Sequence, residues 1–225
     1  MTRVIVTSRE CRSPVLLSRL STKKRLQAFH KNRLCLSDGV IDQMFGIQSD
    51  DTEHRLDHLE LLSRYGNEQF AGDGLSYRDI RGVLRALQPR ANDVIYDLGA
   101  GYGRFLIYGA TIFESTFKGI EIVADRTKIA DRARRRLQLN NLEIITSNVV
   151  DTDIGDGSKF YLFSPFFTKT LLAVIEKLRA CANHRVITIA ALYHSASILA
   201  NEKWLREVKR NHSEEVLTLR LFKSQ

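Results

Sequence analysis

Residues 94–103 read Val-Ile-Tyr-Asp-Leu-Gly-Ala-Gly-Tyr-Gly, a short apolar run that ends at an acid and continues into alternating glycines. The glycines, Gly99, Gly101 and Gly103, allow a strand to turn sharply into a helix and allow a ligand to approach bare backbone. Asp97 stands at the head of this turn, where a carboxylate suits an ammonium group better than a phosphate. The segment therefore predicts a binding site for a small molecule that carries a cationic group.

A second acid, Glu121, ends the next apolar run, Phe117-Lys118-Gly119-Ile120-Glu121. In open α/β sheets, an acid that follows a glycine-rich turn at about this distance binds ribose hydroxyls. A carboxylate can accept hydrogen bonds from both hydroxyls at once, which makes an acid here informative. The alternative is a solvated acid at the end of a strand.

The spacing of the glycines distinguishes this pattern from a dinucleotide site. The dinucleotide fingerprint is Gly-x-Gly-x-x-Gly, whereas Arg104 stands where the last glycine would be. The pattern Asp-x-Gly-x-Gly-x-Gly resembles motif I of the class I S-adenosylmethionine (SAM) methyltransferases, and the resemblance covers roughly residues 65–222. It implies that the cofactor is SAM, which has an amino acid, a sulfonium and an adenosine but no pyrophosphate.

The same resemblance implies a role for each residue of the cofactor site. Asp97 and the turn that follows would hold the methionine part of SAM, and Glu121 would bind its ribose. After the third strand the family usually has an acid that reads the adenine amino group, where this chain has Asn148. Its amide oxygen is still an acceptor, and the nearby Asp151 and Asp153 are alternatives. The implied cofactor-binding residues are Asp97, Gly99, Ala100, Gly101, Gly103, Glu121, Ile122, Asn148 and Val149.

The fourth predicted strand ends in Ser164-Pro165-Phe166-Phe167, where class I enzymes place residues that face the transferable methyl. Adenine and glutamine N-methyltransferases carry Asn/Asp-Pro-Pro-Tyr/Phe there, and this chain lacks both the Asn and the second Pro. Aromatic side chains at this lip could surround a lysine stem with a cation–π contribution. Ser164 and Phe166 are therefore candidate catalytic residues, the alternative being a core strand that runs into a proline turn. Tyr193 and His194 are weaker candidates at the rim.

The segment Tyr65-Gly66-Asn67-Glu68, with the loop and helix after it, resembles lysine methyltransferases of the Dot1 type and those that modify an ATP-synthase subunit. In both, a loop and helix ahead of motif I close over SAM, which makes Tyr65 a third catalytic candidate. The resemblance favours methyl transfer to a protein lysine amine. An RNA or DNA methyltransferase, a small-molecule acceptor and a non-catalytic SAM-binding module remain open.

The net charge of +8 is concentrated at the N-terminus. Residues 1–37 contain nine Lys and Arg against Glu10 alone, whereas residues 38–225 contain 25 basic and 25 acidic residues. Such a basic segment can bind nucleic acid, an acidic protein or an anionic membrane surface. It could instead pack on the domain as a helix, or serve as a transit peptide. We expect a cytoplasmic protein, with an organelle as the alternative.

The overall composition is that of a globular protein, with 44% hydrophobic and 27% charged residues. No apolar run approaches the roughly 20 residues that a membrane-spanning helix needs. The three cysteines, Cys11, Cys35 and Cys181, are scattered and odd in number, which favours a reducing compartment. The cysteines have no metal-binding spacing, and the pair His54-x-x-x-His58 has no third ligand or HExxH pattern beside it, so we expect no metal site.

From residue 93 onward, predicted strands alternate with helices, which indicates an α/β fold with a parallel, doubly wound, Rossmann-like sheet. The predicted strands cover 94–97, 117–121, 142–146, 159–164 and 184–190, with a half-exposed edge strand around 215–222. The predicted helices cover 77–88, capped by Ser76, and 103–114, 124–139 and 168–180. Ahead of these, helices over 14–34 and 51–64 flank a loop at 38–49. We therefore expect a helical N-terminal extension, 1–64, and a SAM-binding domain, 65–225; the oligomeric state is not predicted.

Overall fold

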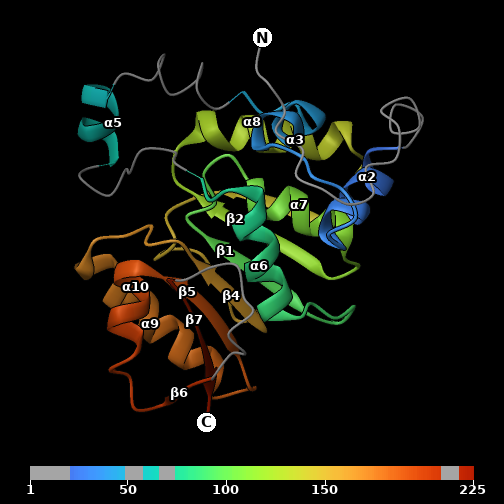
Figure 1. Ribbon diagram of the computed structural model, residues 1–225. Helices are drawn as coiled ribbons and strands as arrows, with labels where there is room; N and C mark the ends of the chain where they lie inside the picture. Colours follow the sequence, from blue (N-terminus) through green and yellow to red (C-terminus); the bar gives the residue numbers. More distant parts are fainter. Residues whose placement is uncertain (1–20, 49–57, 66–73, 209–217) are drawn as a thin grey trace.

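The computed structural model describes residues 21–48, 58–65, 74–208 and 218–225 (Figure 1). The described strands are β1 (Val94–Leu98), β2 (Thr116–Glu121), β3 (Leu142–Thr146), β4 (Lys159–Leu162), β5 (Thr188–Leu192), β6 (Leu205–Glu207) and β7 (Leu219–Ser224). They form one sheet in the order β3-β2-β1-β4-β5-β7-β6. The first five are parallel, and β7 runs antiparallel to both of its neighbours.

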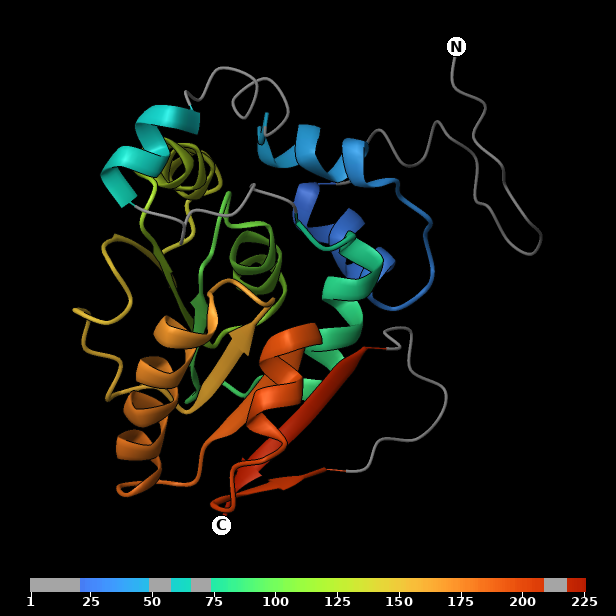
Figure 2. The same cartoon turned by 90° about the vertical axis from the view of Figure 1, so that its left-hand side faces the viewer.

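The described helices cover both faces of this sheet (Figures 1 and 2). They are α2 (Thr22–His30), α3 (Asp38–Phe45), α5 (His58–Tyr65), α6 (Tyr77–Leu87), α7 (Arg104–Ile112), α8 (Ala124–Arg136), α9 (Thr168–Ala182) and α10 (Tyr193–Leu199). Helices α6, α7 and α8 share one hydrophobic core, and α9 and α10 share the other. The architecture is therefore a doubly wound α/β sandwich of three layers.

The central strands are buried on both faces, which explains their continuous apolar runs. In β1, Ile95 belongs to the core under α6 and α7, whereas Tyr96 and Leu98 belong to the core under α9. Helix α7 packs very closely on β2, because a Cβ at Gly119 would lie 2.1 Å from Cδ1 of Leu106. This close packing sets the position of α7, and therefore of the glycine turn that precedes it.

The order of the strands also predicts where a ligand binds. The chain first runs outward through β1, β2 and β3, and then returns to place β4 and β5 on the other side of β1. In open α/β sheets, ligands bind outside the carboxyl ends of the strands at the point where the order reverses. Here that point lies between β1 and β4, directly beyond Asp97 and the glycine turn.

The N-terminal helices pack on the α6–α7 side of the sheet. Leu26 and Phe29 of α2, with Ile41 and Phe45 of α3, are buried in the same core as α6 and α7. Arg81 of α6 donates a hydrogen bond of 2.9 Å to the carbonyl oxygen of Phe29. Residues 22–45 are thus joined to the domain by an apolar core and polar contacts. Residues 1–20 of the predicted basic arm lie outside the described residues.

Two predictions about this N-terminal region were wrong. The loop expected at 38–49 contains α3, because Ser37 takes an extended N-cap conformation and Gly46, with φ of +71°, ends the helix. Asp38 begins this helix and Gly46 follows its last residue, so these two residues mark helix ends rather than a loop. The helix expected over 14–34 ends at His30, and Asn32 has a positive φ of 55°. The part of that prediction before residue 21 lies outside the described residues, as does the 51–57 part of the next helix.

The structure also corrects the end of the sheet. The segment expected to be an edge strand forms β7, which is internal because β6 pairs with its other side. Strand β6 is three residues long, which is too short for an alternating pattern to indicate it in the sequence. Strand β5 begins at Thr188 rather than at 184, since the backbone N–H of His184 donates to the carbonyl of Cys181 in the turn after α9. The predicted cap of α6 is confirmed, because Ser76 Oγ accepts from the N–H of Asp79 at 3.1 Å.

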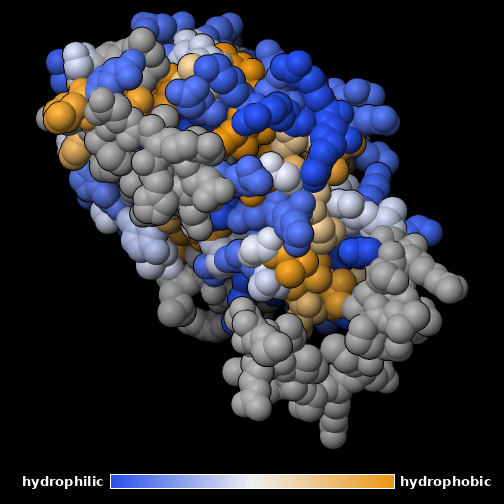
Figure 3. Space-filling view, turned by 90° about the horizontal axis from the view of Figure 1, so that it is seen from above, coloured by the Kyte–Doolittle hydropathy of each residue, from blue (hydrophilic) through white to orange (hydrophobic). Residues whose placement is uncertain are grey.

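Much of the charge of α8 faces solvent, where Arg132, Arg135 and Arg136 are exposed, whereas Arg126 is buried. Hydrophilic side chains, drawn in blue, cover much of the face seen in Figure 3. No helix in the described segments combines the length and the apolar character that crossing a membrane requires.

The close contact between α7 and β2 makes Gly119→Ala a test of the fold. We expect this substitution to lower the free energy of unfolding by about 1–3 kcal/mol, because the added methyl group overpacks against Leu106. Gly39→Ala is the matched control, since its Cβ has no neighbour within 4 Å and it lies in α3. Urea denaturation of both variants measures the difference; equal stability of the two would contradict this packing.

Candidate cofactor and acceptor site

A cavity of about 500 Å³ lies over the carboxyl ends of the parallel strands. Its floor crosses the sheet from β3 to β5, so that each parallel strand contributes residues at or just after its end. The lining residues from these ends are Ser147, Asn148 and Val149 (β3), Glu121 and Ile122 (β2), Asp97, Gly99, Ala100, Gly101 and Tyr102 (β1), Phe163, Ser164, Pro165 and Phe166 (β4), and Tyr193 and His194 (β5).

The structure brings most of the predicted site residues into this one cavity. Asp97, Gly99, Ala100, Gly101, Glu121, Ile122, Asn148 and Val149 line it, as do the catalytic candidates Ser164 and Phe166. Gly103 is not in the lining; it is the N-cap of α7, has a φ of +75°, and packs against Ala130. Tyr65 is the last residue of α5, and its side chain lies outside the described residues.

The glycines of the turn are needed for different physical reasons. Gly99 has a φ of +88°, and a Cβ there would lie 2.3 Å from Cβ of Pro165. Gly101 has a φ of +53°, but a Cβ there would meet no atom within 4 Å. Gly99 therefore permits contact between the turn and the lip of β4, whereas Gly101 leaves room beside the backbone for a ligand.

Glu121 is held rigidly at the end of β2. Its Oε2 accepts a hydrogen bond from the N–H of Gly101 and its Oε1 from the N–H of Val123, each 2.9 Å long. The buried guanidinium of Arg126 has Nη1 at 3.7 Å from Oε1. A carboxylate offers about four lone-pair sites, so these contacts orient Glu121 while leaving acceptor capacity for ribose hydroxyls.

Asp97 lies deeper, with only 3% of its surface exposed. Burial, and then the charge of neighbouring Glu121, raise the pKa of Asp97 well above its ordinary value. A buried carboxyl with a raised pKa is a site where a ligand cation is stabilised, because the cation offsets the cost of the negative charge. This environment fits the ammonium group of an amino acid.

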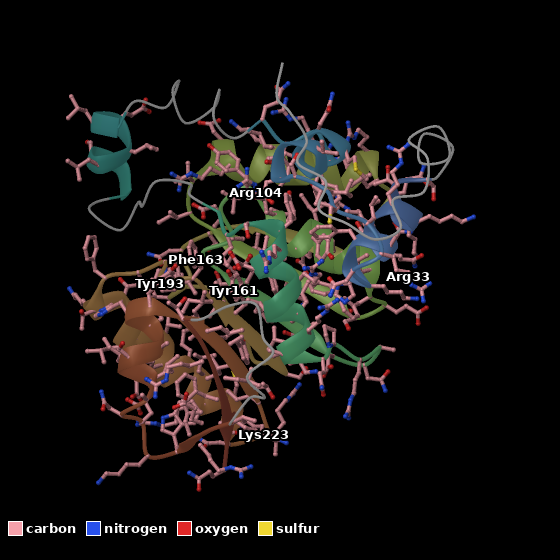
Figure 4. All side chains as sticks on the ribbon, viewed as in Figure 1. Arg33, Arg104, Tyr161, Phe163, Tyr193 and Lys223 are labelled. Atoms are coloured by element: carbon pink, nitrogen blue, oxygen red, sulfur yellow. The ribbon has the colours of Figure 1, made fainter. Side chains whose placement is uncertain are left out.

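Aromatic side chains form the side of the cavity that is built from β4 and β5 (Figure 4). Phe105 of α7 stacks on Tyr161 with ring centroids 4.2 Å apart, and Phe163 meets the ring of Tyr193 edge-on at 5.6 Å. Tyr193 is 55% exposed, so it stands at the opening. Of the two phenylalanines expected at the end of β4, Phe166 lines the cavity and Phe167 does not; the other aromatic rings on this side come from α7, from β4 and the residue after it, and from α10.

Two residues of this lip have strained backbones. Ser164 and Tyr193 have positive φ values of 46° and 51°, a conformation that costs residues other than glycine roughly 1–3 kcal/mol. The hydroxyl of Ser164 donates to the carbonyl oxygen of Leu192 at 2.8 Å and accepts from the N–H of Ser195 at 3.3 Å. Ser164 thus ties the end of β4 to the start of α10, which is the geometry of a positioning residue.

Sequence reasoning missed the residues that α6, α7 and α8 bring to the cavity. Ile80, Arg104, Phe105 and Arg126 all line it. These positions follow the helical pattern of ordinary core or surface residues, so no local signal distinguishes them.

Comparison with solved structures supports the fold. The chain is similar to the Escherichia coli protein yhhF, described as a methyltransferase, with 15% identity, coverage of 66% of this chain and 86% of that one, and a TM-score of 0.51. An RNA methyltransferase from Salinibacter ruber in complex with S-adenosyl-L-homocysteine matches at 20% identity, with coverages of 64% and 88% and a TM-score of 0.46. A dimethyladenosine transferase from Plasmodium falciparum matches at 13% identity, with coverages of 64% and 60% and a TM-score of 0.48.

No protein-family model and no curated protein sequence matches this chain. The likeness to yhhF, at 15% identity, shows the fold alone: together with the strand order, it is a Rossmann-like fold of the kind found in methyltransferases. The predicted fold class is therefore confirmed. None of the three structures compared above is described as a lysine methyltransferase of the Dot1 type.

The environment of Asp97 makes Asp97→Asn a test of the site. We expect the ligand-free variant to unfold at a higher temperature than the wild type, with a gain of about 2 kcal/mol, because the amide removes a buried charge. Since the folded pKa of Asp97 is raised, the wild type loses stability as pH rises through the range between the ordinary and the raised value. The gain should therefore be small at acidic pH and largest above the raised pKa.

Thermal unfolding at a series of pH values measures this gain, and Asp156→Asn is the matched control. Burial raises the pKa of Asp156, but its hydrogen bonds to Lys118 and Tyr96 outweigh burial and lower the pKa, so loss of the Asp156 charge should destabilise the protein. A destabilised Asp97→Asn variant would show that a partner neutralises the Asp97 carboxylate in the wild type.

Proposed function

We propose that the protein is a SAM-dependent methyltransferase. The observation that carries this proposal is the placement of two buried carboxylates, Asp97 and Glu121, in one cavity on either side of a glycine turn. Asp97 would face the ammonium of SAM and Glu121 its ribose hydroxyls. Ile122, after β2, and Asn148 and Val149, after β3, line the side where the adenine would lie.

SAM supplies an activated methyl group when bound, so the protein's task is to position the acceptor and to exclude water. The lip formed by Phe163, Phe166 and Tyr193 lies on the β4–β5 side of Asp97, opposite to the proposed adenine side. An acceptor that enters there would reach the centre of the cavity across the end of β4. Ser164 and the bond it makes to Leu192 would keep this lip in place.

We further propose that the acceptor is the amine of a protein lysine. The amine must lose its proton before it can accept a methyl group, and an apolar surrounding lowers the pKa of an amine by disfavouring the ammonium form. The described lining on the β4–β5 side contains aromatic residues, Pro165, Ser164, Thr170 and His194, and none of these is a carboxylate that would hold the ammonium charged. The lip also lacks the acceptor that an Asn or Asp would offer to a base amino group.

An RNA methyltransferase is the second candidate, and the observation that favours it is the charge of α2 and the turn after it. Lys23, Lys24, Lys31 and Arg33 are exposed there. These cations could contact phosphates, which would make binding strongly dependent on salt. In Figure 1, however, α2 and α10 lie on opposite sides of the molecule, so such contacts would be distant from the lip.

If Glu121 binds the ribose, Glu121→Gln should weaken SAM binding by about tenfold or more, because a neutral amide is a poorer acceptor for two hydroxyls. The substitution also weakens the hydrogen bond that Glu121 accepts from the N–H of Gly101. Glu143→Gln in β3 is the matched control, since Glu143 is exposed and lies outside the cavity lining. Isothermal titration with SAM measures both variants; equal affinities would remove Glu121 from the site.

The acceptor assignment predicts that methyl from radiolabelled SAM enters the protein fraction of a cell extract rather than the RNA fraction. Tyr193→Ala should lower the rate of labelling at least tenfold while leaving the SAM dissociation constant unchanged, because Tyr193 lies at the opening of the lip. Leu172→Ala, an exposed apolar residue of α9 outside the lining, is the control. Label in RNA would favour the second candidate, and SAM binding without label in any fraction would indicate a non-catalytic module.

A further inference from the structure

We infer that the hydroxyl of Tyr161 accepts a hydrogen bond from the attacking amine and so orients the lone pair of that amine toward the methyl group of SAM. The inference rests on the proposed function and adds to it a residue that contacts the acceptor. Tyr161 lies in β4, and in the register of the sheet it is paired with Asp97 of β1. It is therefore the neighbour, on the acceptor side, of the carboxylate proposed to bind the ammonium of SAM.

The hydroxyl of Tyr161 is open to the cavity and has no partner in the protein. Tyr161 lines the cavity although only 4% of its surface is exposed. Throughout the segments that the structure describes, its hydroxyl makes no hydrogen bond. The polar side-chain atoms of those segments that are both fully enclosed and without a partner are Arg179 Nε and Ser195 Oγ. Since the hydroxyl of Tyr161 lacks a partner but is not enclosed, it has surface in the cavity that a ligand can contact.

The ring of Tyr161 is fixed close to the lip. Phe105 of α7 stacks on it, with 19° between the two ring planes. Phe163 and Tyr193 lie beside Tyr161 in Figure 4 and line the same cavity. Tyr161 therefore lies near both Asp97 and the lip, on the route by which an acceptor would reach the centre of the cavity.

The environment of this hydroxyl keeps it neutral. Burial, and then the charges of Asp97 and Asp79, raise the pKa of Tyr161 well above its ordinary value. A neutral phenol oxygen accepts a hydrogen bond without the negative charge that would hold an amine in its ammonium form. An amine that has lost its proton still has N–H groups, and one of them donates to this oxygen while the lone pair faces the methyl carbon.

Tyr161 orients the amine and does not itself exchange a proton. The nitrogen lone pair forms the new bond to the methyl carbon, the bond from that carbon to sulfur breaks, and its electron pair stays on sulfur. The products are S-adenosylhomocysteine and a methylated ammonium, which passes its extra proton to water after release. The contribution of the hydroxyl is therefore geometric, since it limits the directions in which the lone pair can point.

Isothermal titration with S-adenosylhomocysteine and with sinefungin tests this contact without an identified acceptor. In sinefungin, a carbon that bears an amino group replaces the sulfur that bears the methyl group, so an amine occupies the position of the methyl. We expect the wild type to bind sinefungin at least about tenfold more tightly, as for a hydrogen bond to a charged group. Tyr161→Phe should abolish this preference and leave the affinity for S-adenosylhomocysteine unchanged. It should also lower the rate of labelling from radiolabelled SAM at least about tenfold, because the amine is no longer oriented.

Tyr96→Phe is the matched control. Tyr96 is also buried in the centre of the sheet, but its hydroxyl donates to Asp156 at 2.7 Å and it lies outside the cavity lining. This variant should keep the full preference for sinefungin and unfold at a lower temperature than the wild type. Ligand-free Tyr161→Phe should unfold at no lower temperature than the wild type, since it loses a hydroxyl without a partner and keeps the ring that stacks on Phe105.

A preference for sinefungin that persists in Tyr161→Phe, or that the wild type lacks, would overturn the inference. An unchanged rate of labelling in Tyr161→Phe would also overturn it. Weaker binding of S-adenosylhomocysteine by this variant would show that the hydroxyl contacts the cofactor instead, and a lower unfolding temperature would show that it has a partner in the protein; either result contradicts the inference. Failure of the wild type to bind SAM would instead overturn the proposed function, so the two failures are distinguishable.

Discussion

The burial of two carboxylates close together is the constraint on which the rest of this site depends. Asp97 and Glu121 end adjacent parallel strands, and the charge of Glu121 helps to raise the pKa of Asp97. Such an arrangement costs stability in the free protein, because like charges in a region of low dielectric repel one another. Two backbone N–H groups and Arg126 stabilise the charge of Glu121. A ligand cation would in turn lower the cost of burying the charge of Asp97.

The surrounding architecture serves to keep this arrangement rigid. The glycines at 99 and 101 leave the floor without side chains, their N–H groups donate to Ile120 and Glu121, and Gly99 is in close contact with Pro165 at the end of β4. The close packing of α7 on β2 positions the turn, and the Ser164 hydroxyl joins the ends of β4 and β5. Strained φ values occur on the acceptor side, at Ser164 and Tyr193, which is where a binding site commonly stores strain.

The parts of this structure that the sequence predicted are those encoded by local patterns. The apolar runs and the Asp–Gly turn predicted the parallel sheet, and the position of Glu121 after the next run predicted the second carboxylate. The segment 38–45 was misjudged because Asp38 and Gly46 are typical of loops and of helix ends alike. Arg104, Phe105 and Arg126 could not be found, since their contacts with the cavity depend on how α7 and α8 pack across the sheet. The pairing of Asp42 with Arg104 joins residues 62 positions apart and has no local signal.

Isothermal titration with SAM, beside NAD and ATP, should be repeated in buffers of different ionisation enthalpy to detect the titration of Asp97. We expect selective SAM binding at micromolar concentration, accompanied by release of protons. The ammonium of SAM favours the charged form of Asp97 and so lowers its raised pKa. Binding without proton release would contradict the pairing of Asp97 with the ammonium. Binding of NAD or ATP in place of SAM would contradict the assignment of this cavity as a methyltransferase site.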